Sequence, residues 1–281
     1  MTKKKMETFL VLTLGIVQKP TKRCQNPENK NTKDRFLVFP NYEPVHNRIL
    51  HRYKLNEYPP SAVSRSLLRL RVIYVVQKKN ASKRLLTVET CHHYLNINAN
   101  EVPRYRCDFK CCPPIRDAEN QKALWNGLKS GDIDMIVSDH SPSTVEMKLL
   151  VPTGRNYGNF IKAWGGISSV QFGLSLFWTN CQTFGLNIND LLRLMCEEPA
   201  KLCKFNDRKG KLAKGYDADL CIWNPEAEFT VTPDIIHFRN KSNPYMGKRL
   251  KGLVHATIVR GQFAYKRTTG EIFNFVGRLL R

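Results

Sequence analysis

Apolar and polar positions along the chain change character near residue 85. From there on, short apolar runs alternate with segments of helical period. The segment 120–130 places its apolar residues on one face of a predicted helix, namely Leu124, Trp125 and Leu128. Gly131 is expected to end that helix, and 85–89 and 133–137 read as short buried strands. A helix, a glycine turn and a strand in this order predict a parallel α/β fold.

The pattern continues as helices and then changes to strands. Residues 167–184 are expected to be helical, and Asn189-Asp190 is expected to cap a helix over 191–204. The predicted buried face of that helix holds Leu191, Leu194 and Met195. After Phe205 the chain is rich in turns, with strands expected at 219–223 and 256–259 and a hairpin turn at Gly261-Gln262. This last part is predicted to be a small β module.

Residues 1–84 show no comparable order. Their apolar residues come in short runs between Lys, Arg, Asn and Pro, and no period lasts three turns. The apolar stretch 9–17 follows three lysines and resembles a secretory signal, but no small-residue cleavage site follows it. The competing interpretations of that stretch are a buried strand or a stretch of poor coding quality. We expect 1–84 to be a basic segment that is poorly ordered or misassembled.

Charge is concentrated in the same segment. The 281-residue chain carries 45 Lys and Arg against 24 Asp and Glu, a net charge of +21. Residues 1–84 hold 19 of the basic and 5 of the acidic residues. They contain no zinc-finger, helix-turn-helix or RNA-binding motif, so nucleic-acid binding rests on charge alone and is not expected. No apolar run approaches the roughly 18 residues of a membrane span, so no membrane association is expected.

The nine cysteines predict a reducing, cytoplasmic setting. Their number is odd, and no pair has the C-x-x-C spacing. Cys107, Cys111 and Cys112 do cluster, but a zinc knuckle needs a second pair further on, and none follows. We therefore do not expect a structural metal in that cluster.

A candidate for chemistry is Asp139, which follows the predicted strand 133–137. In an α/β barrel the catalytic groups collect at the carboxyl ends of strands, where a carboxylate suits metal ligation or proton transfer. An Asp just past a strand is also a common turn or helix-cap residue. The position alone leaves both interpretations open.

Strings of residues around Asp139 carry a more specific signal. Five occur in order: VETCHHYL (88–95), FKCCPPIR (109–116), IDMIVSDHSP (133–142), AWGG (163–166) and GYDAD (215–219). NPYMG (243–247) and TIVRG (257–261) follow. Together they resemble the allantoinase family of the cyclic amidohydrolases, a group that also holds dihydroorotases and hydantoinases. The resemblance covers about 85–281, roughly the last 70% of the chain.

This resemblance implies a fold and domains. The family fold is a metal-dependent (β/α)8 barrel with a small β domain built from both chain ends. Residues 85–207 would then be the last strands and helices of the barrel, and 208–281 a segment of the β domain. The N-terminal segment 1–84 stays unmatched.

The resemblance also implies a reaction, hydrolysis of the hydantoin ring of allantoin to allantoate in purine catabolism. In the family, two divalent metal ions, for which zinc is the expected identity, bridge a hydroxide ion. Asp139 would be both a metal ligand and the catalytic base. Substrate contacts are implied for four further residues: Cys111, Cys112, Ser141 and Trp164. The partners implied are a small cyclic ureide and further copies of the chain, since the family forms homotetramers.

The histidines and the thiols near these strings have other interpretations. Neighbours on a strand point to opposite faces, so His92 and His93 are expected to be a structural pair and not one chelate. His140 is expected to brace the loop after Asp139. Cys111 or Cys112 could instead act as a nucleophile, which would need a partner histidine and a lowered pKa.

Most of the family's metal ligands are missing from the sequence. It has no His-x-His, and the segment 59–65, where a further His is expected, has none; His51 lies about a dozen residues too early. One carboxylate does not hold two ions, so this chain is not expected to bind them fully. Three explanations stay open: a truncated or misassembled reading of a longer gene, a degenerate paralogue, or completion by another chain. The alternative function is a non-catalytic amidohydrolase chain.

Overall fold

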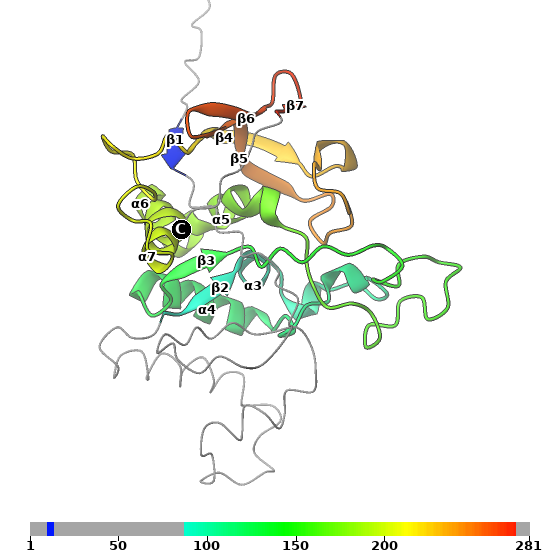
Figure 1. The fold of residues 1–281 in the computed structure, drawn as a ribbon. Helices are drawn as coiled ribbons and strands as arrows, with labels where there is room; N and C mark the ends of the chain where they lie inside the picture. Colours follow the sequence, from blue (N-terminus) through cyan, green and yellow to red (C-terminus); the bar gives the residue numbers. More distant parts are fainter. Residues whose placement is uncertain (1–9, 14–86, 274–281) are drawn as a thin grey trace, which may run out of the picture.

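The computed structural model describes residues 10–13 and 87–273. Two short parallel strands lie at the centre of the α/β part, β2 (Glu89–Cys91) and β3 (Met135–Val137). Glu89 pairs with Met135 and Cys91 with Val137. Helix α4 (Ala118–Ser130) joins this pair as a crossover, and the short helix α3 (His92–Asn96) follows β2 directly (Figure 1). The parallel pairing confirms the predicted α/β arrangement.

Helix α4 buries the predicted face and ends at the predicted glycine, but it begins two residues earlier than predicted. The side chain of Asp117 caps it by accepting a hydrogen bond from the backbone N–H of Asn120 at 2.9 Å. Gly131 ends it with a φ of 82°, which glycine adopts without steric cost. Trp125 and Leu128 are fully buried. The indole N–H of Trp125 donates to the backbone oxygen of Leu95, which anchors α4 to α3.

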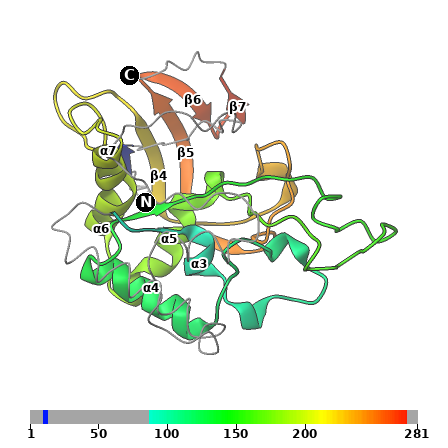
Figure 2. The ribbon, with the colours of Figure 1, turned by 60° about the horizontal axis from the view of Figure 1, so that its bottom comes forward.

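Helices α5 (Gly173–Cys181), α6 (Ile188–Leu192) and α7 (Glu198–Leu202) complete the α/β part, as Figure 2 shows from below. A 3-10 turn precedes α5 at Val170–Phe172, another follows it at Gln182–Phe184, and a π-helical turn joins α6 to α7 over Arg193–Glu197. A hydrophobic core forms between these helices and the two strands. Its members include Leu95, Trp125, Ile136, Phe177, Cys181 and Leu194.

Several predicted boundaries shift. The predicted strand 85–89 is described only in part, because 85 and 86 lie outside the described residues; the strand itself is β2, which begins at Glu89, and Val88 before it bonds Asp134 through both its N–H and its carbonyl. The true cap of the α6 helix is Asn187, which forms a reciprocal capping box with Asp190. Residues 167–169 are not helical.

The β module is a five-stranded antiparallel sheet in the order β1-β4-β5-β6-β7. Its long strands are β4 (Leu220–Thr230) and β5 (Arg249–Val259), and β6 (Gln262–Lys266) and β7 (Glu271–Ile272) form the far edge. The hairpin turn is Arg260-Gly261, one residue earlier than predicted, and both residues have positive φ as in a type I′ turn. Strand β1 (Leu10–Thr13) pairs with β4, so part of the apolar stretch 9–17 is a strand.

Helix α5 lies between the sheet and the strand pair (Figure 1). Trp178 of α5 meets Trp223 of β4 edge to face, with 5.1 Å between ring centroids. The indole N–H of Trp178 donates to the backbone oxygen of Pro225, and the Ser175 hydroxyl donates to that of Gly252. These contacts fix the β module against the barrel segment.

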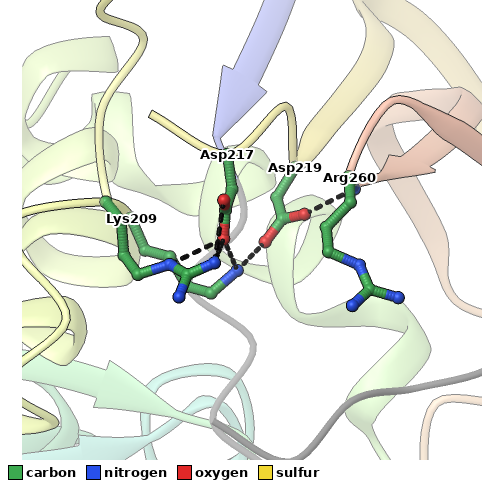
Figure 3. Close-up of polar contacts among 5 residues, drawn as sticks. Lys209, Asp217, Asp219 and Arg260 are labelled. Carbon is green, nitrogen blue, oxygen red and sulfur yellow. Dashed lines mark hydrogen bonds and ion pairs between the residues drawn. The ribbon is translucent and has the colours of Figure 1, made fainter. Parts of the chain in front are cut away.

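The GYDAD string holds the loop before β4 (Figure 3). Asp217 receives two hydrogen bonds from the Arg208 guanidinium, both at 3.0 Å, and one ion pair from Lys209. Asp219 also contacts Lys209, and its other oxygen accepts the backbone N–H of Arg260 at 2.8 Å. Burial raises the pKa of Asp217, but the hydrogen bonds from Lys209 and Arg208 outweigh it and lower that pKa. The string therefore ties the loop to the β5–β6 turn.

Within the described residues, no helix has both the length and the apolar character that crossing a membrane requires.

Candidate active site

Parallel pairing brings three chemically active side chains to one edge of the strand pair. Because Cys91 pairs with Val137, the residues two positions further on, His93 and Asp139, leave the strands at the same end. One donor atom each of Cys91, His93 and Asp139 lies within 4.8 Å of the other two. The Asp139 side chain is exposed, and its φ of 42° lies in the left-handed region that Asp tolerates better than most residues. This places the predicted catalytic Asp139 at the carboxyl end of a strand.

The interpretation of His92 and His93 as strand neighbours is wrong. Both belong to α3, which starts immediately after Cys91, so pleat geometry does not separate them. His92 packs against Gly173, where an added Cβ would lie 2.6 Å from its Nε2. His93 is 1% exposed, and among the described residues neither of its ring nitrogens has a hydrogen-bond partner. Burial lowers the pKa of His93 to about 3, so its imidazole is neutral.

The segments that carry the predicted substrate contacts meet around Gly165 and Gly166. A Cβ on Gly165 would lie 2.8 Å from Sγ of Cys112, and one on Gly166 would lie 2.4 Å from Oγ of Ser141. The backbone N–H of Ser141 donates to the oxygen of Ile167. Only glycine permits these approaches. The structure thus brings together Cys112 and Ser141 from loops far apart in the sequence.

A buried lysine joins the same loops. Lys148 is 3% exposed, and its ammonium donates to the backbone oxygen of Lys110 at 2.9 Å and to that of Gly166. The N–H of Gly166 donates to the same Lys110 oxygen. Burial lowers the pKa of Lys148 from 10.5 to about 8, although the charge of Asp108 opposes the shift. Lys148 therefore clamps the 110–112 loop to the 164–167 segment.

The side chain of Cys111, in the middle of the 110–112 loop, is a buried thiol. Its side chain donates to the oxygen of Pro113, as does the Tyr94 hydroxyl at 2.7 Å, and the peptide bond between Cys112 and Pro113 is cis. Burial raises the pKa of Cys111 to about 12, so the group is a thiol at neutral pH. This disfavours Cys111 as a nucleophile, and it places its side chain in a packing role.

Two further side chains frame the site. His140 accepts the backbone N–H groups of Ser169 and Val170 at its Nδ1, which confirms that it braces the loop. The indole N–H of Trp164 is buried and has no hydrogen-bond partner among the described residues. A ligand carbonyl that reached it would satisfy a donor whose burial otherwise costs about 1–3 kcal/mol.

Comparison with known proteins leads to the same class of protein as the resemblance of the sequence strings. A model of the amidohydrolase family matches residues 48–264, so this chain belongs to the amidohydrolase family. The match begins in residues that the structure does not describe. The chain is 46% identical over 182 residues to an allantoinase from Arabidopsis thaliana and 40% identical over 195 residues to a probable allantoinase from Dictyostelium discoideum. These alignments cover 64% and 69% of this chain.

Solved structures agree with the sequence relatives. An L-hydantoinase from Arthrobacter aurescens matches with a TM-score of 0.65 and 30% identity over 72% of this chain and 44% of its own. A D-hydantoinase from Thermus sp. matches with a TM-score of 0.62 and 27% identity, covering 71% of this chain and 43% of its own. The fold is thus the C-terminal part of an amidohydrolase barrel with part of its β domain. The chain spans only 35% and 38% of the two allantoinases.

Amidohydrolases are generally metal-dependent, so the donor set matters. Among residues 10–13 and 87–273, one group of three or more metal-capable side chains is close enough to share an ion: Cys91, His93 and Asp139. Three donors around one point suit a single ion. They do not fit the pair of bridged ions that the resemblance implies.

Sequence reasoning missed three residues at this site: Cys91, His93 and Lys148. His93 follows Cys91 by two residues, and Asp139 follows Val137 by two residues. This equal spacing is visible in the sequence, but it brings His93 and Asp139 together only because Cys91 pairs with Val137. Lys148 looks like any surface lysine in the sequence. Only the tertiary fold shows that it is buried.

Proposed function

We propose that this chain carries the substrate-facing C-terminal part of an allantoinase-type amidohydrolase, which opens the hydantoin ring of allantoin to give allantoate. The observation that carries the proposal is that the 110–112 loop and Ser141, which lies two residues after Asp139, both pack against the 164–166 segment. The names of the sequence relatives, allantoinases, point to the same substrate. Purine breakdown is the setting that this substrate implies.

The chemistry of a cyclic ureide matches these groups. Its ring presents carbonyl acceptors and amide N–H donors in one plane. The Ser141 hydroxyl and the Trp164 indole N–H can donate to ring carbonyls, and backbone oxygens of the 110–112 loop can accept from ring N–H groups. We propose that Cys112 contributes to the substrate-binding surface, because its Sγ lies against Gly165. Cys111 would shape the loop from below.

Asp139 is the group proposed to move the proton. Hydrolysis of a ring amide adds water to the carbonyl carbon and breaks the C–N bond, so a proton must leave the water and reach the leaving nitrogen. A carboxylate that is exposed at a strand end can accept the first proton and return it to the nitrogen. His140 keeps the following loop in place through its two backbone contacts.

The test is allantoin hydrolysis by the full chain and by Asp139→Asn. Loss of a general base typically costs 10²–10⁴-fold in rate, so we expect kcat/KM to fall by at least about 100-fold. The exposed Asp207→Asn is the matched control, because it removes a carboxylate of the same type far along the chain. Equal activity of Asp139→Asn and wild type would refute the proposed role of Asp139.

A non-catalytic chain is the second candidate, favoured by the single three-donor cluster among the described residues. Such a chain would bind an intact amidohydrolase or act without chemistry. Absence of allantoin hydrolysis, together with stable co-purification with a full-length relative, would support it. A monodisperse chain that hydrolyses allantoin would exclude it.

The remaining expectations stay proposals. We propose domain segments at 1–84, 85–207 and 208–281, zinc as the preferred metal, assembly into a homotetramer and a cytoplasmic setting. Light scattering would measure the assembly. Limited proteolysis followed by mass spectrometry would locate the boundaries, and we expect one cleavage in the exposed turn around Leu212.

A further inference from the structure

We propose that Cys91 at the end of β2, His93 in the first turn of α3 and Asp139 in the loop that follows β3 form a site for one Zn²⁺ ion. The inference goes beyond the proposed function, since it requires neither a second ion nor a substrate and shares only Asp139 with it. No other residue of the family's implied ligand set takes part.

The geometry is close to that of a metal-bound triad. In tetrahedral zinc sites the bonds are about 2.0–2.3 Å, which puts ligand atoms roughly 3.5 Å apart. The three donor atoms here lie within 4.8 Å of one another. Closing them onto an ion therefore takes shifts of about 1 Å.

His93 points independently to a ligand. Its imidazole is 1% exposed and is unpartnered at both nitrogens among the described residues. A buried polar ring without hydrogen bonds is costly, and most such groups in proteins have a partner. An ion bound to one ring nitrogen of His93 would give a partner to one of these two nitrogens.

The donor set selects a particular class of ion. A thiolate and an imidazole favour zinc over magnesium or calcium, which prefer oxygen ligands. On binding, the S–H bond of Cys91 breaks and its proton passes to the solvent, while sulfur donates its electron pair to the metal. Thiolate and carboxylate then balance the two charges of the ion. A neutral complex suits this largely buried position.

One side of the site stays open. Cys91 is 9% exposed and His93 is buried, but Asp139 faces solvent. Three protein ligands and one free position are the arrangement of catalytic zinc sites, whereas structural sites are closed by four. The ion would thus lie beside the loops assigned to substrate binding, with a position for water.

The test is metal binding by the full chain. Equilibrium dialysis and elemental analysis should give one zinc per chain. Replacement by Co²⁺ should give a near-ultraviolet thiolate-to-cobalt band. Cys91→Ser should abolish this band, and His93→Gln should keep it while weakening binding by at least about tenfold.

Cys221→Ser is the matched control, because Cys221 is also buried, with a pKa raised by burial to about 12, but lies on β4 outside the cluster. It should bind metal like wild type, and circular dichroism would check that each variant folds. No bound metal, or a cobalt band that persists in Cys91→Ser, would overturn the inference. Two ions without a thiolate band, with allantoin hydrolysed, would overturn it and leave the proposed function standing.

Discussion

The buried Lys148 makes a quantitative prediction about stability. Its ammonium is held between the backbone oxygens of Lys110 and Gly166, and burial lowers its pKa from 10.5 to about 8. At about 1.4 kcal/mol per unit, this difference corresponds to about 3 kcal/mol. Between about pH 8 and pH 10.5, Lys148 is protonated in the unfolded chain but has lost its proton in the folded chain. The free energy of unfolding should therefore rise with pH in this window.

Lys148→Met removes this titration and isolates its effect. Urea unfolding, followed by tryptophan fluorescence, would be measured for both proteins from about pH 7 to about pH 10.5. The difference between wild type and variant cancels the other titrating groups. We expect this difference to shift in favour of wild type by about 3 kcal/mol over that range.

The exposed Lys214→Met is the control, and its difference from wild type should not change with pH. A difference that also stays constant for Lys148→Met would show that the lysine is solvated in the folded chain. The clamp between the 110–112 loop and the 164–167 segment would then be wrong.

Three further variants test the fold and the site. Gly166→Ala would place a methyl 2.4 Å from Oγ of Ser141, so we expect a loss of about 1–3 kcal/mol in thermal or urea unfolding and a raised KM for allantoin. Asp219→Asn weakens the contact with Lys209, and a loss of about 1–3 kcal/mol in urea unfolding is expected. Trp125→Phe removes a buried indole and its hydrogen bond, which should cost about 1–3 kcal/mol in urea unfolding; a neutral result would contradict the assigned core.

The sequence by itself determined the family and the local elements that depend on short-range chemistry. Ordered strings identified a cyclic amidohydrolase, and the family model and relatives confirm it. Helix α4 was predictable because its apolar face and the glycine that ends it both depend on residues within a few turns of one another. Asp139 was found because a strand end is visible in the apolar pattern. Its role stays a prediction.

Only the tertiary structure decided which side chains meet. His93 becomes a partner of Asp139 through the register between β2 and β3, a long-range pairing that no local pattern encodes. The interpretation of His92 and His93 failed for a different reason, because the strand ends at Cys91 and α3 begins at the next residue. Lys148 is buried because loops distant in sequence close over it. Burial and register arise from packing among distant segments, and those properties set the chemistry of the site.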